Sequence, residues 1–351
     1  MKRNRIKKKI AGNTDSESRI DEIEPIDPHK IPITIGLKPR KDQEIEHTTE
    51  CAFGIDPLPG GICSPPQELH KMKEFILSKK KEKEEDTISL SSLNEPVKIV
   101  EKVKKVLHCT TESCIYEAPE FRSFIGETKA QHILEEHFLP VGPRNNTNLL
   151  SNHNIEAVLN QFTKEFPDFV HIPFQMLDFL ETKTELVYLD LLFYLKQGYR
   201  RFGCVFNTDV STGKGKHWFC LFLDFSKLSK QDVENCLHRS IPTLLRCTPR
   251  CTIEYFNSSG NPARPQVEYW CINKEKELRR QLKGINSWII KATDLRHQWS
   301  HTECGVYSLF YIWQRLQGRS YIEFAENWIT DEQMIQARKS FFRERIKPFE
   351  K

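Results

Sequence analysis

The sequence predicts a domain in which helices pack with short buried strands, and three observations support this. After Cys304, apolar residues recur at helical spacing as far as Leu316, and Gly318 follows in the position of a C-terminal cap. Residues 202–206 and 218–223 are uninterrupted apolar runs with the length of buried strands. A third strand of this kind is predicted over residues 252–256, just before a Ser-Ser-Gly turn.

Length and composition narrow the class of protein. The chain has 351 residues, of which 38% are hydrophobic and 28% charged, so we expect one sizeable core with accessory segments. The net charge of +4 is too small to indicate nucleic-acid binding by itself. No apolar run approaches the length of about 18 residues that a membrane span needs. The 11 cysteines are odd in number and irregularly spaced, which favours free thiols in a reducing, cytosolic-type compartment.

The first part of the chain is predicted to carry accessory segments. Residues 1–93 are highly charged and are expected to be largely disordered, apart from one charged helix over residues 67–85. The basic start, MKRNRIKKKI, has three possible interpretations: a nuclear localisation signal, a contact for nucleic acid, or a solvated tail. Residues 94–141 show helical periodicity and are predicted to form a helical accessory domain. Four of its side chains have zinc-ligand chemistry but fit no common finger spacing, so ordinary core and surface roles are favoured: Cys109, Cys114, His132 and His137.

Residues 142–351 are predicted to form the main domain. Its first helix is expected to be capped by Asn152 or Asn154, with a buried stripe running from Ile155 to Phe166. A helix or strand is expected over residues 186–195. These elements come before the first predicted strand.

Cys304 is the first candidate for chemistry. It lies at the start of a core helix and directly after a polar loop. The positive end of the helix dipole is expected to lower the pKa of its thiol and favour the nucleophilic thiolate. Gly305 is expected to leave room for a substrate backbone beside the sulfur. A plain core cysteine is the alternative interpretation.

His217 and Asn257 are the second and third candidates. His217 follows a glycine-containing turn and opens the strand over residues 218–223, where a side chain can face a cleft. Asn257 ends the next strand, where it can form an ordinary turn or can accept the Nδ1 proton of His217 and leave Nε2 facing the thiol. Asp224 competes for this role but is on the same strand as His217, so it cannot easily fold back onto the imidazole.

The order His217, Asn257, Cys304, with Gln298 before the cysteine, resembles the ubiquitin-like-specific (SUMO-protease-like) cysteine proteases, the clan of the adenovirus protease. Longer phrases are closer still to the polyprotein-processing proteases of African swine fever virus and other large DNA viruses. These phrases are PRNNTNLL, FGCVFNTDVSTGKGKHW, IEYFNSSGN and RHQWSHTECGVYSLFYI. The resemblance covers residues 142–351.

The resemblance implies an α+β, papain-like fold, with a central mixed sheet packed on helices, and a role for each matching residue. Cys304 matches the nucleophile, His217 the general base and acid, and Asn257 the third member of a triad. Gln298 matches the side chain of the oxyanion hole, and Trp218 matches the substrate-binding tryptophan beside the histidine. Neither a metal nor another cofactor is implied.

Two departures from the family accompany this match. Most cellular members have aspartate where this chain has Asn257, so a full negative charge beside the imidazole is absent. Residues 227–251 are an insertion relative to the viral relative. The insertion carries side chains that either bind a metal or form a surface loop with free thiols: Cys236, His238, Cys247 and Cys251.

The family implies cleavage after small residues, above all Gly-Gly. The favoured function is maturation of viral core or capsid polyproteins at Gly-Gly-X sites during virion assembly, in the virion or the host cytoplasm. Alternatives are removal of ubiquitin or SUMO from host proteins, an acetyltransferase on the same site, and a non-catalytic virion scaffold that contacts nucleic acid through its basic N-terminus. The Gly60-Gly61-Ile62 sequence also suggests self-cleavage between Gly61 and Ile62, in a segment expected to be accessible.

Overall fold

The structure is a computed structural model, and it describes residues 50–82, 95–145, 147–238, 250–282 and 286–344. All of them belong to one structural unit. The basic N-terminal stretch lies outside the described residues, as does Cys247 of the insertion, and the side chains of Cys236 and His238 are not described either.

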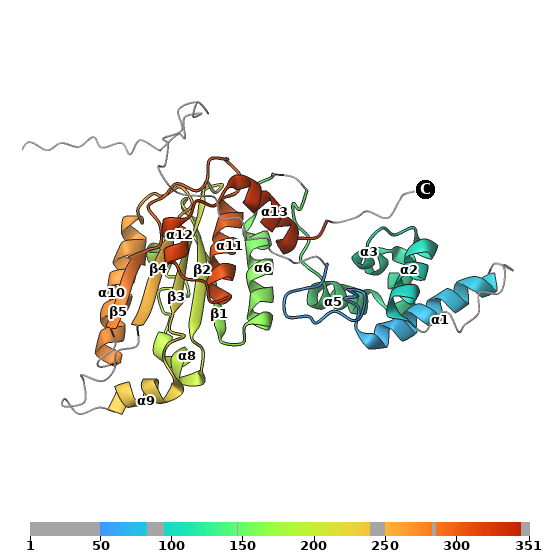
Figure 1. Cartoon of the computed structure of the whole chain (residues 1–351), viewed down its shortest axis with the longest axis horizontal. Helices are drawn as coiled ribbons and strands as arrows, with labels where there is room; N and C mark the ends of the chain where they lie inside the picture. The colour runs from blue at the N-terminus through green and yellow to red at the C-terminus, as the bar shows by residue number, and fades with distance from the viewer. Residues whose placement is uncertain (1–49, 83–94, 146, 239–249, 283–285, 345–351) are drawn as a thin grey trace, which may run out of the picture. The chain divides into compact units, whose positions relative to one another are not determined.

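A five-stranded mixed sheet forms the centre of the main domain (Figure 1). The strands lie in chain order: β1 (Phe169–Gln175), β2 (Arg201–Asn207), β3 (Trp218–Asp224), β4 (Arg250–Phe256) and β5 (Asn286–Lys291). The two outer pairs, β1 with β2 and β4 with β5, are parallel, whereas β3 runs antiparallel to both of its neighbours. A central mixed sheet packed on helices confirms the predicted α+β class.

Helices cover both faces of this sheet, which explains why β2 and β3 are apolar without alternation between their end residues, over residues 202–206 and 218–223. Cys220 and Phe222 of β3 pack into one core cluster with α6 (Asn152–Glu165) and α11 (Cys304–Leu316). Phe219 and Leu221 point to the other face, into a cluster with α8 (Leu191–Gln197) and α10 (Pro265–Gln281). The helix α11 after Cys304 is therefore a core helix, as its periodicity predicts.

A buried ionic network ties α11 to the strands. The Glu254 carboxylate is fully buried and accepts hydrogen bonds from the Tyr311 hydroxyl at 2.7 Å and from Arg315 Nε at 2.7 Å. Arg315 Nη2 also binds Asp224 at 2.8 Å. Because Asp224 is engaged by α11, it is not the partner of His217. This fixes α11, and with it Cys304, against β3 and β4.

Local capping groups define the ends of helices in the main domain. The N-cap of α6 is Ser151 and not the expected Asn152 or Asn154, and Asn154 instead accepts a hydrogen bond from the Ser151 backbone N–H through its side chain. Gly318 has a φ of 81° just beyond α11, in the left-handed conformation that ends a helix. The remaining elements are α7 (Phe179–Thr182), α9 (Lys230–His238), α12 (Ile322–Glu326) and α13 (Asp331–Phe341).

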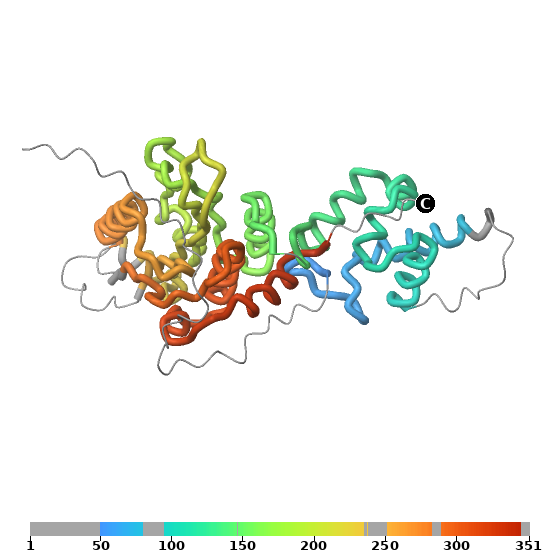
Figure 2. Tube along the Cα trace, turned by 90° about the horizontal axis from the view of Figure 1, so that it is seen from above, coloured from blue at the N-terminus to red at the C-terminus, as the bar shows by residue number. Residues whose placement is uncertain are grey.

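The helices before residue 140 form a second core, which we call the arm. They are α1 (Pro66–Glu82), α2 (Pro96–Leu107), α3 (Glu112–Glu117), α4 (Pro119–Ile125) and α5 (Glu127–His137), drawn from blue to green in Figure 2. The helices α2 to α5 confirm the helical periodicity of residues 94–141, and α1 confirms the charged helix predicted over residues 67–85 as far as Glu82. Residues 50–82 differ from the prediction of disorder, because Met72 and Phe75 of α1 are buried in the same cluster as Ile99 of α2.

Two disulfides cross-link the arm, contrary to the expectation of free thiols. Cys51 is bonded to Cys63 and Cys109 to Cys114. Cys109 and Cys114 are therefore not thiolate ligands for zinc, and no group of three potential ligands for a metal occurs in the described ranges. The free cysteines of the described part all lie in the main domain: Cys204, Cys220, Cys251, Cys271 and Cys304.

The Gly61–Ile62 bond lies inside the loop that the first disulfide closes. Gly60 and Gly61 both have positive φ values, 86° and 77°, and the Gly61 N–H donates to the Leu58 carbonyl at 3.0 Å. The Ile62 side chain is buried in the arm core. Gly60 is exposed and Gly61 half-buried, but the bond lies in a tight turn next to a buried side chain and not in the disordered segment that was expected.

Loss of the Cys51–Cys63 disulfide is expected to destabilise the arm by about 3 kcal/mol, since the bond closes a loop with a sequence separation of 12. The Cys51→Ser/Cys63→Ser variant should show this in urea unfolding. The Cys109→Ser/Cys114→Ser pair, with a separation of 5, serves as the comparison and should lose about 2 kcal/mol. Unchanged unfolding of both pairs would contradict a structural role for the disulfides.

Candidate active site

Cys304 is the first residue of α11 and is almost completely buried, with 1% of its surface exposed. Burial raises the pKa of its thiol to about 11, and the nearby Glu303 carboxylate acts in the same direction. Hydrogen bonds from the backbone N–H groups of Trp218 and Gly305 to the sulfur oppose this rise. The start of the helix therefore lowers the pKa of the thiol as predicted, but this effect is smaller than the rise in pKa that desolvation causes. The contact with Trp218 places the sulfur beside the start of β3, where His217 lies.

Leu150 covers the start of α11. A Cβ atom added to Gly305 would lie 3.1 Å from the side chain of Leu150, so this glycine allows close packing rather than leaving room for a substrate. The Trp218 indole Nε1 donates to the Leu150 carbonyl at 3.0 Å, and only 7% of Trp218 is exposed. Trp218 is thus part of the same core cluster as Cys304.

His217 and Asn257 are brought together across the ends of β3 and β4. His217 Nε2 lies 2.7 Å from Asn257 Oδ1. The nitrogen differs from the prediction, which paired Asn257 with Nδ1. The orientation of the Asn257 carboxamide is set by its other partners, since Nδ2 donates to the Tyr255 hydroxyl at 3.0 Å and Oδ1 accepts from the Ser259 N–H at 3.1 Å.

This orientation determines the tautomer of neutral His217. Because Asn257 presents an oxygen, His217 Nε2 must carry the hydrogen, and Nδ1 keeps its lone pair. Burial lowers the pKa of His217, the Asn257 hydrogen bond raises it, and the positive charge of the exposed Arg264 lowers it. At neutral pH the resting pair is therefore a neutral thiol and a neutral imidazole, whereas the sequence analysis favoured a thiolate at Cys304.

Ser258, the residue that follows Asn257, holds the side chain of Gln298 in place. The Ser258 hydroxyl donates to Gln298 Oε1 at 2.7 Å, and Gln298 Nε2 donates one hydrogen to the Ser300 carbonyl at 2.8 Å. The Gln298 backbone N–H also donates to the Ser258 carbonyl at 3.0 Å. With its oxygen bound by Ser258, the carboxamide has a second N–H to offer, which is the group that an oxyanion hole requires.

Gly260 allows the loop after β4 to approach the segment before Gln298 closely. A Cβ atom there would lie 2.9 Å from the Asp294 carbonyl oxygen, and its φ of 73° favours glycine as well. Sequence reasoning missed Ser258 and Tyr255 as neighbours of the site. The strand period of two was the available signal for Tyr255, because residues 255 and 257 lie on the same side of the chain.

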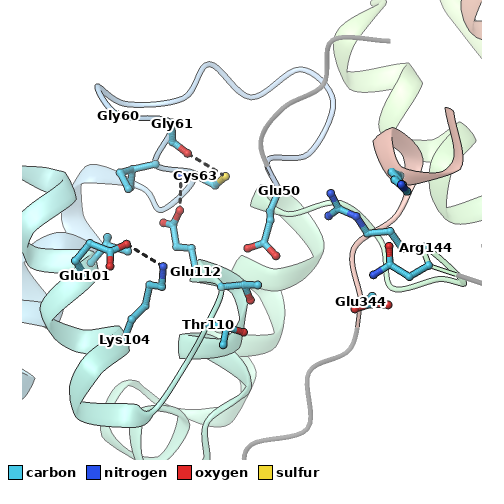
Figure 3. Close-up of a pocket in the computed structure, with 15 residues that line it drawn as sticks. Glu50, Gly60, Gly61, Cys63, Glu101, Lys104, Thr110, Glu112, Arg144 and Glu344 are labelled. Atoms are coloured by element: carbon cyan, nitrogen blue, oxygen red, sulfur yellow. Dashed lines mark hydrogen bonds and ion pairs between the residues drawn. The ribbon is translucent and has the colours of Figure 1, made fainter. Parts of the chain in front are cut away.

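The cavity drawn in Figure 3 lies elsewhere. It has a volume of about 550 Å³ and is lined mainly by arm residues, with Glu112 and Lys104 among them, and none of the candidate catalytic residues lines it. Burial raises the pKa of Glu112, while the backbone N–H groups of Cys63 and Ser64 bind its carboxylate. Within the part of the chain that the structure describes, no helix combines the length and apolar composition needed to span a membrane.

Comparison with known proteins gave viral cysteine proteases. A cysteine protease of African swine fever virus, strain Badajoz, is 35% identical over 303 residues, which cover 80% of this chain and 97% of the relative. A putative thiol protease of Acanthamoeba polyphaga mimivirus is 22% identical over 239 residues, covering 68% of this chain and 70% of the relative. The crystal structure of the African swine fever virus protease superposes with a TM-score of 0.63 at 29% identity, covering 84% of this chain and 96% of that one. No family model matches the chain.

Proposed function

Because the chain belongs to the SUMO-protease-like viral cysteine proteases, we propose that it is an endopeptidase that cleaves after Gly-Gly-type sites with Cys304, His217 and Asn257 as its triad. The observation that carries the proposal is the 2.7 Å contact between His217 Nε2 and Asn257 Oδ1. It leaves Nδ1 unprotonated on a histidine whose neighbour, Trp218, hydrogen-bonds to the Cys304 sulfur. A nucleophile, a base and the group that orients the base are thus supplied together.

The mechanism follows from the protonation states. His217 Nδ1 takes the thiol proton as Cys304 attacks the scissile carbonyl, and the Asn257 oxygen stabilises the imidazolium through Nε2–H. The free N–H of Gln298 and the backbone N–H of Cys304 stabilise the oxyanion, a contribution of about 3 to 4 kcal/mol for a single donor. Nδ1–H then protonates the leaving amine, and water hydrolyses the thioester.

The preference for glycine is supported by the burial of the nucleophile. Only 1% of Cys304 is exposed, and Leu150 packs against Gly305 at the start of the same helix. A peptide that reaches the sulfur between such walls must lack side chains next to the scissile bond. A Gly-Gly sequence fulfils this condition, whereas larger residues require the walls to move.

For substrates, we propose viral structural polyproteins with Gly-Gly-X sites, cleaved in the virion or the host cytoplasm. The support is that the similar proteins are encoded by African swine fever virus and by a mimivirus. Ubiquitin-like modifiers are the second candidate, because another relative at 35% identity is named a SUMO-1 cysteine protease. Nucleic acid is a candidate partner of the basic N-terminal stretch only, which lies outside the described residues.

The deciding experiment compares two substrate types. Gly-Gly-X peptides and ubiquitin or SUMO fusions are incubated with the native protein, with Cys304→Ala and with Cys271→Ala. The last variant removes another buried thiol, which lies on α10 in the other core cluster of the sheet. We expect peptide cleavage by the native protein and by Cys271→Ala, none by Cys304→Ala, and intact fusions. Cleavage of the fusions in preference to the peptides would establish modifier removal instead. No Cys304-dependent cleavage of either substrate by the folded protein would leave the scaffold interpretation.

A further inference from the structure

We propose that Tyr255 is a positioning residue of this active site, whose hydroxyl fixes the orientation of the Asn257 carboxamide and thereby the tautomer of His217. The inference rests on the proposed function, since it concerns the same histidine. Tyr255 precedes Asn257 by two residues at the end of β4, and its hydroxyl oxygen lies 3.0 Å from Asn257 Nδ2. It touches neither Cys304 nor His217 through any hydrogen bond, so it acts on them through Asn257 alone.

The direction of each hydrogen bond follows from the chemistry of the groups. The Tyr255 hydroxyl lies 3.2 Å from the Pro262 carbonyl oxygen, which can only accept. The single hydroxyl hydrogen therefore goes to Pro262, and the lone pairs of the hydroxyl face Asn257. An acceptor at this point requires the NH₂ group of Asn257 on the side of Tyr255 and its oxygen on the side of His217.

Burial makes this constraint effective. Tyr255 is 4% exposed and Asn257 is 4% exposed, so water does not readily replace a missing partner. On the other side of Asn257, Oδ1 accepts from the Ser259 N–H at 3.1 Å and from the Ser259 hydroxyl at 2.8 Å. The hydroxyl of Ser259 can turn to accept as well as donate. The backbone N–H of Ser259 and the hydroxyl of Tyr255 are thus the two groups that distinguish oxygen from nitrogen at Asn257.

A flipped Asn257 would disable the base. With its NH₂ group towards His217, Nε2 would have to accept a hydrogen bond, and the imidazole proton would move to Nδ1. His217 would then carry a proton on the nitrogen that is required to take one from Cys304. A carboxylate at position 257 has two equivalent oxygens and would not need this control, so the role of Tyr255 exists because the residue is an asparagine.

Kinetics of Tyr255→Phe in two backgrounds test the proposal. In the native background we expect kcat to fall roughly three- to tenfold with KM unchanged, as for the loss of one buried hydrogen bond. In the Asn257→Ala background the same substitution should cause no further loss, because there is no carboxamide to orient. Tyr269→Phe, which removes the hydroxyl of a tyrosine that is 62% exposed, is the matched control and should leave kcat unchanged.

An equal loss in both backgrounds would overturn the proposal, because the hydroxyl would then act by tethering Pro262 or by packing. A Tyr255→Phe variant with native kcat would overturn it as well. Both outcomes require an active native enzyme. If the native protein shows no Cys304-dependent cleavage, the proposed function fails and kinetics cannot be used.

Nitrogen-15 NMR of His217 decides the inference without activity. The spectra are recorded on Cys304→Ala and on Cys304→Ala/Tyr255→Phe, with His217→Gln used to assign the signal. We expect a ring protonated on Nε2 in the first protein and a measurable share of the Nδ1–H tautomer in the second. The same Nε2–H tautomer in both proteins would show that Tyr255 does not control the tautomer, whatever the outcome of the cleavage assay.

Discussion

Replacing His217 with alanine is expected to lower kcat/KM at neutral pH by roughly 10²- to 10⁴-fold, the usual contribution of a general acid and base. The effect is large because burial raises the pKa of Cys304 to about 11, so the thiol does not ionise by itself near neutral pH. In the proposed mechanism, His217 Nδ1 removes the thiol proton during attack. Without the imidazole, only the small thiolate fraction reacts.

The pH dependence should change in a characteristic way. In the native enzyme the base must be unprotonated, and the pKa of His217 is lowered from 6.5 by burial and by Arg264. Activity should therefore persist as pH falls to 6.5 and decline only at more acidic pH. In His217→Ala this decline should be absent, and kcat/KM should instead rise about tenfold per pH unit until pH approaches the thiol pKa of about 11.

Peptide cleavage measured from pH 5 to pH 10 checks both statements. His153→Ala is the matched control, because His153 is an exposed histidine of α6. It should retain native rates and the native profile. If His217→Ala kept the native profile within a few fold of the native rate, His217 would not be the base.

The strands and the order of the candidate residues were predictable from the sequence because the signals are local. β2 and β3 contain continuous apolar runs, β4 carries Ile253, Tyr255 and Phe256, and both His217 and Asn257 stand at a strand end, next to a turn. A helix that is apolar on nearly all sides, as α11 is, must lie in a core. These features depend on residues that are neighbours in the chain, so they can be predicted from the local sequence pattern alone.

The misassigned features all depend on residues far apart in the chain. The pKa of Cys304 is set by burial under Leu150 and β3, which the dipole argument did not include. The nitrogen of His217 that faces Asn257 is fixed by the side chains around the carboxamide, not by strand order. Residues 50–82 look charged and aperiodic by themselves, but a disulfide and contacts with α2 to α5 bury their few apolar side chains.

Arg338→Met is expected to be strongly destabilising, by about 3 to 5 kcal/mol, because it would leave a carboxylate buried without its partner. Arg338 of α13 binds Glu303, the residue before the nucleophile, at 2.8 Å, and 1% of each side chain is exposed. Its guanidinium also donates to the carbonyl oxygen of Asn148 at 2.8 Å. A single side chain thus joins α13, the loop before α11 and the segment that leads to Leu150.

Urea unfolding provides the measurement, with a lower midpoint and an unchanged slope expected for Arg338→Met. Arg319→Met is the matched control, since Arg319 is exposed and its contact with Glu323 is 4.0 Å long, so it should change stability by less than about 1 kcal/mol. Arg338→Lys separates charge from geometry: a lysine keeps the ion pair but cannot reach Glu303 and the Asn148 carbonyl together. We expect the stability of Arg338→Lys to lie between that of Arg338→Met and that of the native protein. Equal stability of Arg338→Met and Arg319→Met would show that the buried pair of Arg338 and Glu303 does not hold the loop before α11.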